Sequence, residues 1–292
     1  MSAVDAGLVD GRAPAVKNSA WLGLRRRLGL AALVVIAGLG LMAFFAPVLP
    51  VADPTDVDLT NTFAPPSAGH PFGTDSNGRD ILARLVWGSR TALLGPLIVT
   101  VVATAVGVLL AVVASWRGGW VDGVVSRTFD LLFAFPGILL ALVVAAVVGA
   151  GFGAGVAALS LASIPYVGRV TRGGALQQLR QPYVAALRVL GQSPAAICGR
   201  HLVPNLGAII VAQAAVTFGY ALVDLAALSY LGLGVDQATP DWGVIVAAGQ
   251  SAILSGYPQQ SLYAGVLIII TVAAFCIVAE RIAGQDHWRR LR

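Results

Sequence analysis

The stretch Thr91–Ser115, TALLGPLIVTVVATAVGVLLAVVAS, decides the fold class because it runs for 25 residues without a single charge. A helix of about 20 apolar residues crosses a bilayer core about 30 Å thick and satisfies its backbone polar groups internally. The whole chain of 292 residues is 57% hydrophobic and 11% charged, whereas soluble domains carry about 25% charged residues. The sequence therefore predicts an all-α, polytopic membrane protein.

Uncharged runs of similar length predict six transmembrane helices. The run 131–168 is too long for one helix, and glycines between Gly149 and Gly155 permit a reversal, so it counts as two spans. The first uncharged run, residues 28–49, is longer than the apolar part of a signal peptide, so it should remain in the membrane. We expect, in chain order, a cytoplasmic tail 1–27, a first transmembrane helix 28–49, an extracytoplasmic segment 50–90 with an interfacial helix, a transmembrane core 91–282 and a cytoplasmic tail 283–292.

The basic residues predict the orientation of these spans. If the N-terminus is cytoplasmic, sixteen of the 19 basic residues fall in inside segments, and only Arg79, Arg84 and Arg90 fall outside. Cytoplasmic loops of membrane proteins carry such an excess of Lys and Arg. The net charge of +5 thus reflects topology rather than nucleic-acid binding, and we expect both termini in the cytoplasm.

The sequence lacks the motifs of several catalytic classes. Its only lysine is Lys17, followed by Asn18, so the chain cannot form a lysine-bearing phosphate loop, and we expect neither ATP hydrolysis nor a bound cofactor. The three histidines fall on different sides of the membrane, and Cys198 and Cys276 are too few for a disulfide framework or a metal site. Transport, or holding a complex together, remains, and transport is the stronger of the two.

The inside loop between the fourth and fifth spans is about 35 residues long, which is unusual for a connection between two helices. It predicts one short helix over 181–190, ended by Gly191, and a second over 194–202, capped by Ser193 and ending before Pro204. Isolated helices below about 12 to 15 residues are marginal in water. These two therefore need a docking surface, which implies a cytoplasmic partner.

The stretch Tyr183–Asn205, YVAALRVLGQSPAAICGRHLVPN, resembles the coupling loop of ABC importer permeases of the dipeptide/oligopeptide/nickel family. In that family an EAA pattern, a following glycine and a later proline dock into a groove on the ATPase. One departure is Ala185, which stands where the family has a glutamate. Within a loop bounded by 169–205, the resemblance implies coupling residues Tyr183, Ala185, Ala186, Gly191, Pro204 and Asn205.

Four further stretches carry the same resemblance, in the family's order and on the predicted sides of the membrane. The match extends from His70 to about Arg281, and it implies the type I importer permease fold with six transmembrane helices. The stretches are HPFGTDSNGRDILARLVWGSR (70–90), RTFDLLFAFPGILLAL (127–142), LSYLGLGV (228–235) and PDWG (240–243).

Polar residues in these stretches are candidates for function. The extracytoplasmic motif offers a glycine turn and then a helix start, which would fix the outside segment against the bundle or contact a binding protein. We expect Asp130 at the inside start of the third span, paired with Arg127. Asp224 lies within an apolar span, where a carboxylate is costly, so it faces either the pathway or a polar packing partner. The residues of the extracytoplasmic motif are Gly73, Asp75, Gly78, Arg79 and Asp80.

The resemblance implies a transport subunit rather than an enzyme. Its partners would be a second homologous permease, two ATP-binding subunits that use ATP and Mg, and an extracytoplasmic substrate-binding protein, all at the bacterial cytoplasmic membrane. Peptides are the implied cargo. The alternatives are nickel or another small solute, a proton-coupled secondary transporter that titrates Asp224, and a scaffold that transports nothing.

Overall fold

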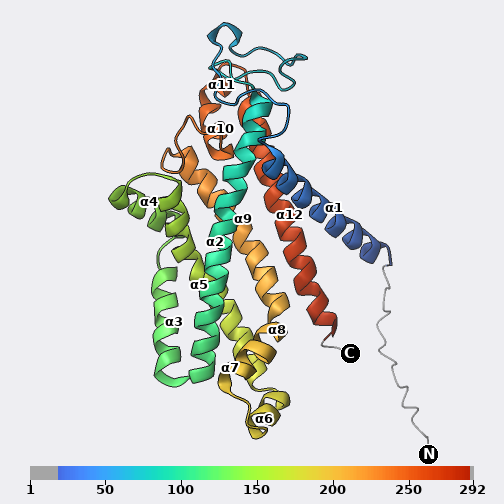
Figure 1. Cartoon of the computed structure of the whole chain (residues 1–292), viewed down its shortest axis with the longest axis vertical. Helices are drawn as coiled ribbons and strands as arrows, with labels where there is room; N and C mark the ends of the chain where they lie inside the picture. The colour runs from blue at the N-terminus through green and yellow to red at the C-terminus, as the bar shows by residue number, and fades with distance from the viewer. Residues whose placement is uncertain (1–18, 290–292) are drawn as a thin grey trace, which may run out of the picture.

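A computed structural model describes residues 19–289 of the chain, with side chains from residue 27 to residue 283. Five long helices dominate it, and four of them (α2, α5, α9 and α12) run along the long axis of the molecule (Figure 1). The all-α fold expected from the sequence is confirmed, since the described part contains helices and a single isolated bridge. The long helices are α1 (Ser19–Phe45), α2 (Ile81–Arg117), α5 (Phe152–Leu179), α9 (Gly207–Tyr230) and α12 (Gln259–Arg289).

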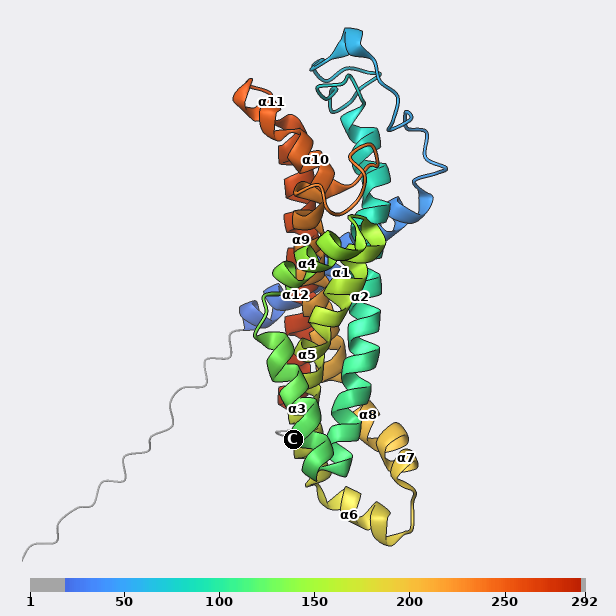
Figure 2. The ribbon, with the colours of Figure 1, turned by 90° about the vertical axis from the view of Figure 1, so that its left-hand side faces the viewer.

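A bent helix pair takes the place of the expected third span. α3 (Gly119–Phe133) and α4 (Gly137–Val148) meet at an angle of 81°, and Figure 2 shows α4 turned across the bundle. Proline disfavours a helical conformation of the residue before it and removes one backbone donor, so the helix stops ahead of Pro136. A straight span beginning near Leu131 was therefore wrong, although the pair counted as one span gives six.

The helix expected near the end of 50–90 is present, but it is not separate from the following span. Ile81 begins a single helix of 37 residues that continues to Arg117, with Pro96 inside it. At 1.5 Å per residue, α2 is about 55 Å long, which exceeds the thickness of a bilayer core. The ten residues 81–90, about three turns, are therefore the start of this long helix and not a helix of their own.

The ends of the chain differ from the expected boundaries. α1 already begins at Ser19 and ends at Phe45, and α12 continues to Arg289, so parts of both expected tails are helical. The remaining tail residues, 1–18 and 290–292, lie outside the described residues.

Short elements gather at the two ends of the bundle. At the upper end in Figure 1 lie residues 46–80 with the turn η1 (Leu59–Asn61), followed far along the chain by α10 (Trp242–Ala248) and α11 (Gln250–Leu254). The expected break between the third and fourth spans is present, because Gly149 and Gly151 have positive φ between α4 and α5. The lower end carries α6 (Pro182–Val189), α7 (Pro194–Ile197), η2 (Cys198–Leu202) and α8 (Val203–Asn205).

Glycine lets the central helices approach closely. A Cβ added at Gly107 of α2 would lie 2.9 Å from the Ile164 carbonyl oxygen of α5, and one added at Gly168 would lie 2.4 Å from the ring of Phe129. Small residues at such contacts are how membrane helices gain packing energy, since lipid supplies no hydrophobic force between them.

Candidate functional site

The lower-end loop begins as the sequence predicts, with a short helix, a turn and the start of a second helix. α6 ends before Gly191, whose φ of +73° is the left-handed conformation that glycine adopts without strain. The Ser193 side chain then accepts a hydrogen bond from the Ala196 amide at 3.3 Å, and Pro194 occupies the first turn of α7. Local chemistry therefore fixes this turn.

The sequence analysis expected the second helix of the loop to end before Pro204, and this was wrong. The chain passes through η2, a π-helical turn in which the Val203 amide donates to the Cys198 carbonyl, and continues through Pro204 in α8. Proline cannot donate and its ring clashes with the carbonyl four residues earlier in an α-helix. The wider π turn relieves that conflict, so the helical path reaches α9 almost unbroken.

Tyr183 and Asn205, both candidate coupling residues, meet in the structure. The Tyr183 hydroxyl donates to Gln178 Oε1 at 3.2 Å and accepts from Asn205 Nδ2 at 3.3 Å. Val184 beside it is buried. These contacts tie α6 to the end of α5 and to α8, so the two ends of the loop hold each other.

The exposed surface of α6 is mostly apolar, with Arg188 as its charged exception. Ala185 and Ala186 are exposed, while Val189 is 88% and Leu190 75% exposed. Ala185 supplies only a methyl group where the resembling family has a carboxylate. Contact at this surface would therefore rest mainly on shape and apolar burial, without a carboxylate at position 185.

At the upper end, Asp75 organises the extracytoplasmic motif. Its Oδ1 accepts from the amides of Asn77 and Arg79 at 2.8 and 2.9 Å, and its Oδ2 accepts from Arg84 Nη1 at 2.5 Å. The Asp75 and Arg84 side chains are almost completely buried. This charged pair joins the motif to the first turn of α2, which supports the interpretation that the motif anchors the outer segment.

The two motif glycines occupy places that no side chain could fill. A Cβ at Gly73 would lie 2.5 Å from the Ala64 carbonyl oxygen, and one at Gly78 would meet the Asp58 carbonyl oxygen at 1.8 Å. Both have positive φ. The part of the outer segment that contains Asp58 and Ala64 therefore packs directly against the motif.

Asp80 caps α2, as the sequence indicates. Its Oδ1 accepts from the Ala83 amide at 2.6 Å, and its Oδ2 lies 2.8 Å from His70 Nδ1. His70, the first residue of the stretch 70–90, thus contacts Asp80 directly.

Asp130 has a different place and partner from those expected. It lies near the C-terminal end of α3 rather than at a helix start, and its Oδ1 accepts from Arg169 Nη2 of α5 at 2.5 Å. Both side chains are largely exposed. The expected partner Arg127 was therefore wrong: the carboxylate of Asp130 reaches across to the neighbouring helix α5 instead of along its own helix.

Asp224 lines a cavity of about 480 Å³ between α4, α5 and α9. No hydrogen bond or ion pair to its carboxylate occurs within the described residues, and the Thr217 hydroxyl in the same lining also lacks a partner there. The expectation of a polar packing contact therefore finds no partner in this part of the chain. The remaining lining is Pro136, Gly137, Ile138, Leu159, Ala162, Ser163, Tyr166, Gln213 and Tyr220.

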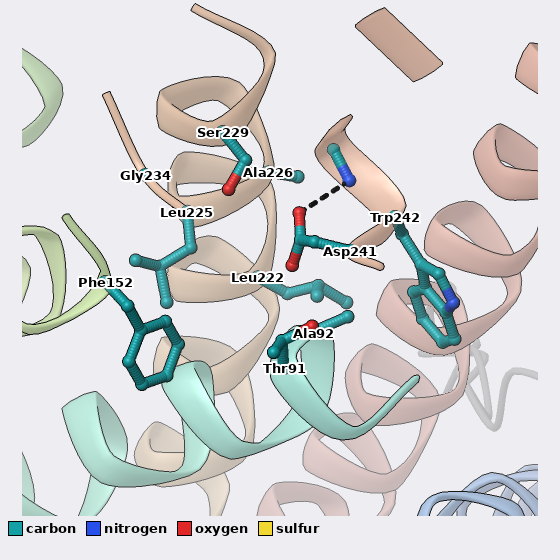
Figure 3. A pocket seen from close by; sticks show the side chains of 11 residues that line it. Thr91, Ala92, Phe152, Leu222, Leu225, Ala226, Ser229, Gly234, Asp241 and Trp242 are labelled. Atoms are coloured by element: carbon teal, nitrogen blue, oxygen red, sulfur yellow. Dashed lines mark hydrogen bonds between the residues drawn. The ribbon is translucent and has the colours of Figure 1, made fainter. Parts of the chain in front are cut away.

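A tighter junction surrounds Asp241 near the upper end (Figure 3). Its Oδ1 accepts from the Gly243 and Val244 amides at 2.9 and 3.3 Å and so caps α10. Burial raises the pKa of Asp241, although these amides and the Ser229 hydroxyl act in the opposite direction. Next to it, Trp242 Nε1 donates to the Leu85 carbonyl at 3.0 Å. The PDWG stretch thus locks α10 onto α2.

Several contacts could not be found by sequence reasoning. Arg172 of α5 holds Asp122 of α3 through two hydrogen bonds of 2.6 and 2.5 Å, fifty residues apart along the chain. Arg84 carried one signal, its place among the few basic residues that the sequence predicts outside the membrane. Among the described residues, no group of three His, Cys, Asp or Glu side chains is placed to hold a metal ion.

Comparison with known families assigns the class of protein. A model described as the inner membrane component of binding-protein-dependent transport systems matches residues 103–285. A second, described as the N-terminal transmembrane domain of oligopeptide transport permease C, matches residues 20–66. The chain belongs to the family of inner membrane components of binding-protein-dependent transport systems, and it is a multi-pass membrane permease subunit of an ABC importer.

Individual proteins narrow the comparison. The chain is 32% identical over 256 residues to the dipeptide transport system permease protein DppC of Alkalihalophilus pseudofirmus, covering 88% of this chain and 84% of the relative. It is 31% identical over 280 residues to the oligopeptide transport system permease protein OppC of Bacillus subtilis, covering 96% and 92%. A chain of the inward-facing MetNI methionine ABC transporter shares its fold, with a TM-score of 0.57 at 20% identity over 69% of this chain and 95% of that one.

Proposed function

We propose that this chain lines one half of the pathway through which an ATP-driven importer moves peptides across the bacterial cytoplasmic membrane. The observation that carries the proposal is the likeness, over most of the chain, to permeases named for dipeptide and oligopeptide transport. A second, homologous permease subunit would supply the other half of the pathway. Peptide cargo fits these relatives better than nickel or another small solute.

The lower-end loop is the proposed contact with the ATP-binding subunits. Its exposed apolar surface at Val189 and Leu190 has no partner in the described part of the chain, and its two ends are held together through Tyr183. An apolar projection on a stiff base suits insertion into a groove. Ala185, Ala186, Gly191 and Pro204 would shape that projection, and the loop and both termini would face the cytoplasm.

The upper end is the proposed side of the substrate-binding protein. It carries the segment 46–80 and helices α10 and α11, which are anchored by Asp75 and Asp241. The Asp224 cavity lies between the two ends, on α9, and we place it on the pathway. An unpaired carboxylate in a membrane helix usually faces the interior of a bundle or a water-filled path.

The chain would perform no bond chemistry itself. The ATP-binding subunits would supply the ATP and Mg²⁺ site, and their movement would reach this chain through α6 and α7. Binding of ATP would open the pathway toward the loaded binding protein, and hydrolysis would return it toward the cytoplasm.

Uptake into proteoliposomes tests the function. The complete complex should accumulate dialanine inside when ATP is supplied to its ATP-binding subunits, and should accumulate none with a pH gradient alone. Accumulation driven by the gradient without ATP would establish a proton-coupled transporter and reject the proposal. ATP-driven uptake of Ni²⁺ without uptake of dialanine would replace peptides as the cargo.

The coupling loop is tested by Gly191→Pro, because proline cannot adopt the positive φ of this turn. The variant should lose both the ATP-binding subunits and uptake. Gly256→Pro is the matched control: Gly256 also has a positive φ, with open space around it, but lies at the upper end. ATP-binding subunits that stay bound to the Gly191 variant, or leave both variants equally, would contradict the assignment.

A further inference from the structure

A second cavity, of about 420 Å³, lies at the upper end of the molecule between the extracytoplasmic motif, the end of α9 and helices α10 and α11. It is separate from the Asp224 cavity, with which it shares no lining residue. Its volume falls within the range of about 300 to 1,000 Å³ that is usual for small-molecule sites. Its lining consists of Asn77, Arg79, Arg84, Ser229, Tyr230, Gln237, Ala238, Val244, Ala247, Ala248 and Gln250.

Arg84 lines this cavity, and one edge of its guanidinium is buried without a hydrogen-bond partner among the described residues. Its Nη1 donates to Asp75, whereas Nε and Nη2 have no hydrogen-bond partner in the described part of the chain, although only 1% of the residue is exposed. Nε and Nη2 share one side of the planar group, and their N–H bonds point in parallel. Two parallel donors of this kind match the two oxygens of one carboxylate. The unpaired edge of Arg84 thus has both donors that a bidentate ion pair with one carboxylate needs.

Two cationic side chains line the cavity. Arg79 lines the same cavity, and its buried Nε likewise lacks a partner among the described residues. None of the lining residues named above is acidic. Three carboxylates adjoin the lining, and backbone amides donate to each of them: Asp75 accepts from Asn77 and Arg79, Asp236 from Ala238, and Asp241 from Gly243 and Val244. Of the three, only Asp75 is bonded to one of the two lining arginines.

Neutral donors complete the lining. The Tyr230 hydroxyl donates to Gln250 Oε1 at 2.7 Å, which fixes the amide so that its nitrogen remains a donor. Gln237 and Asn77 add further amide groups. A carboxylate alone would fill only a small part of a cavity of about 420 Å³, so its ligand has room for a short chain attached to the carboxylate.

We propose that this cavity binds the C-terminal carboxylate of the cargo peptide, with Arg84 and Arg79 as its cationic partners. The inference rests on the proposed function, since it takes peptides as the cargo. The C-terminal carboxylate is present on every unmodified peptide, so a site for it accepts peptides of many sequences. The cavity would receive the peptide at the face turned toward the binding protein, before the peptide reaches Asp224.

Binding of dialanine and of dialanine amide to the purified complex, without its binding protein, tests the proposal. The two ligands differ in the carboxylate alone. Wild type should bind dialanine at least about tenfold more tightly than the amide, because a charge-assisted bidentate pair is lost with the amide. Arg84→Lys keeps the charge beside Asp75 but removes the paired donors, so it should weaken dialanine binding about tenfold and leave amide binding unchanged.

Arg90→Lys is the matched control. Arg90 lies on the same helix, is exposed and does not line the cavity, so its variant should bind both ligands as wild type does. If Arg84→Lys fails to fold, Arg79→Gln carries the same test, with the same loss expected for dialanine alone. Equal binding of acid and amide by wild type, or equal loss of both in the Arg84 and Arg79 variants, would overturn the proposal.

Two further measurements separate this site from its alternatives. If Arg84→Lys instead weakens docking of the binding protein loaded with dialanine amide, the carboxylate belongs to that protein and the proposal is wrong. Uptake separates the site from the function. Arg84-dependent dialanine binding without ATP-driven uptake would reject the proposed function and keep the cavity, whereas uptake without such binding would do the reverse.

Discussion

Replacing Asp75 by asparagine isolates the charge that joins the outer motif to α2. The substitution preserves the shape of the side chain and one oxygen that can accept from the Asn77 and Arg79 amides. The second oxygen, which accepts from Arg84 Nη1 at 2.5 Å, becomes an amide nitrogen. Two donors then face each other, and the buried Arg84 keeps its charge without a counter-ion.

The expected loss follows from burial. The two side chains of the pair are 1% and 2% exposed, so water cannot replace the missing carboxylate without opening the motif. Removing one partner of a buried ion pair costs about 3–5 kcal/mol. We therefore expect Asp75→Asn to lower the free energy of unfolding by an amount in this range.

The assay is a denaturant titration of the purified chain in detergent. Asp53→Asn is the control, because Asp53 lies in the same outer segment but its carboxylate is exposed and contacts only Thr55. Its unfolding midpoint should match that of wild type. Protection of the 46–80 backbone from hydrogen exchange should fall in the Asp75 variant alone.

A double variant decides whether the lost charge is the cause. Asp75→Asn with Arg84→Gln removes both charges and leaves two amides able to bond to each other, so it should recover part of the stability lost by Asp75→Asn. A single variant as stable as wild type, or a double variant less stable than the single one, would refute the reasoning.

Three more outcomes are expected from the same unfolding titration. Gly168→Ala should lower the free energy of unfolding by about 1–3 kcal/mol, because the new Cβ lies 2.4 Å from an aromatic ring, whereas Gly173→Ala on the same helix, with open space around it, should cost nothing. Arg172→Gln should cost about 1 kcal/mol or less, since its pair with Asp122 is partly exposed. The raised pKa of Asp241 means that its protonated form favours the fold: stability from this group is present below the ordinary Asp pKa and lost as the pH rises through the higher folded pKa. Asp241→Asn should remove that pH dependence.

The sequence was sufficient for features that depend on neighbouring residues or on contact with lipid. Long uncharged runs predicted the membrane helices, because such helices need apolar side chains around their whole circumference. Gly191 and Ser193 predicted the turn of the coupling loop, because positive φ and side-chain capping are local properties. The Gly149 and Gly151 reversal between α4 and α5 follows from the same local freedom of glycine.

Features set by distant packing could not be predicted. The break at Pro136 is different, because it is a local signal that the span expected from Leu131 overlooked: mean hydropathy does not record a missing backbone donor. Asp130 was assigned a neighbour in sequence, whereas its partner is Arg169, thirty-nine residues away on another helix. The free edge of Arg84 depends on which nitrogen Asp75 takes, and only a folded motif decides that.

The course of α9 bears on how the two ends of the molecule communicate. It begins at Gly207, two residues after the loop ends at Asn205, carries Asp224 into the middle cavity and ends at Tyr230 in the upper cavity. Its 24 residues span about 36 Å as one helix. A helix of this length tilts more easily than it shortens, because shortening breaks its backbone hydrogen bonds. A displacement of the loop that tilts α9 therefore moves both cavities together, and no relay of side-chain contacts between them is needed.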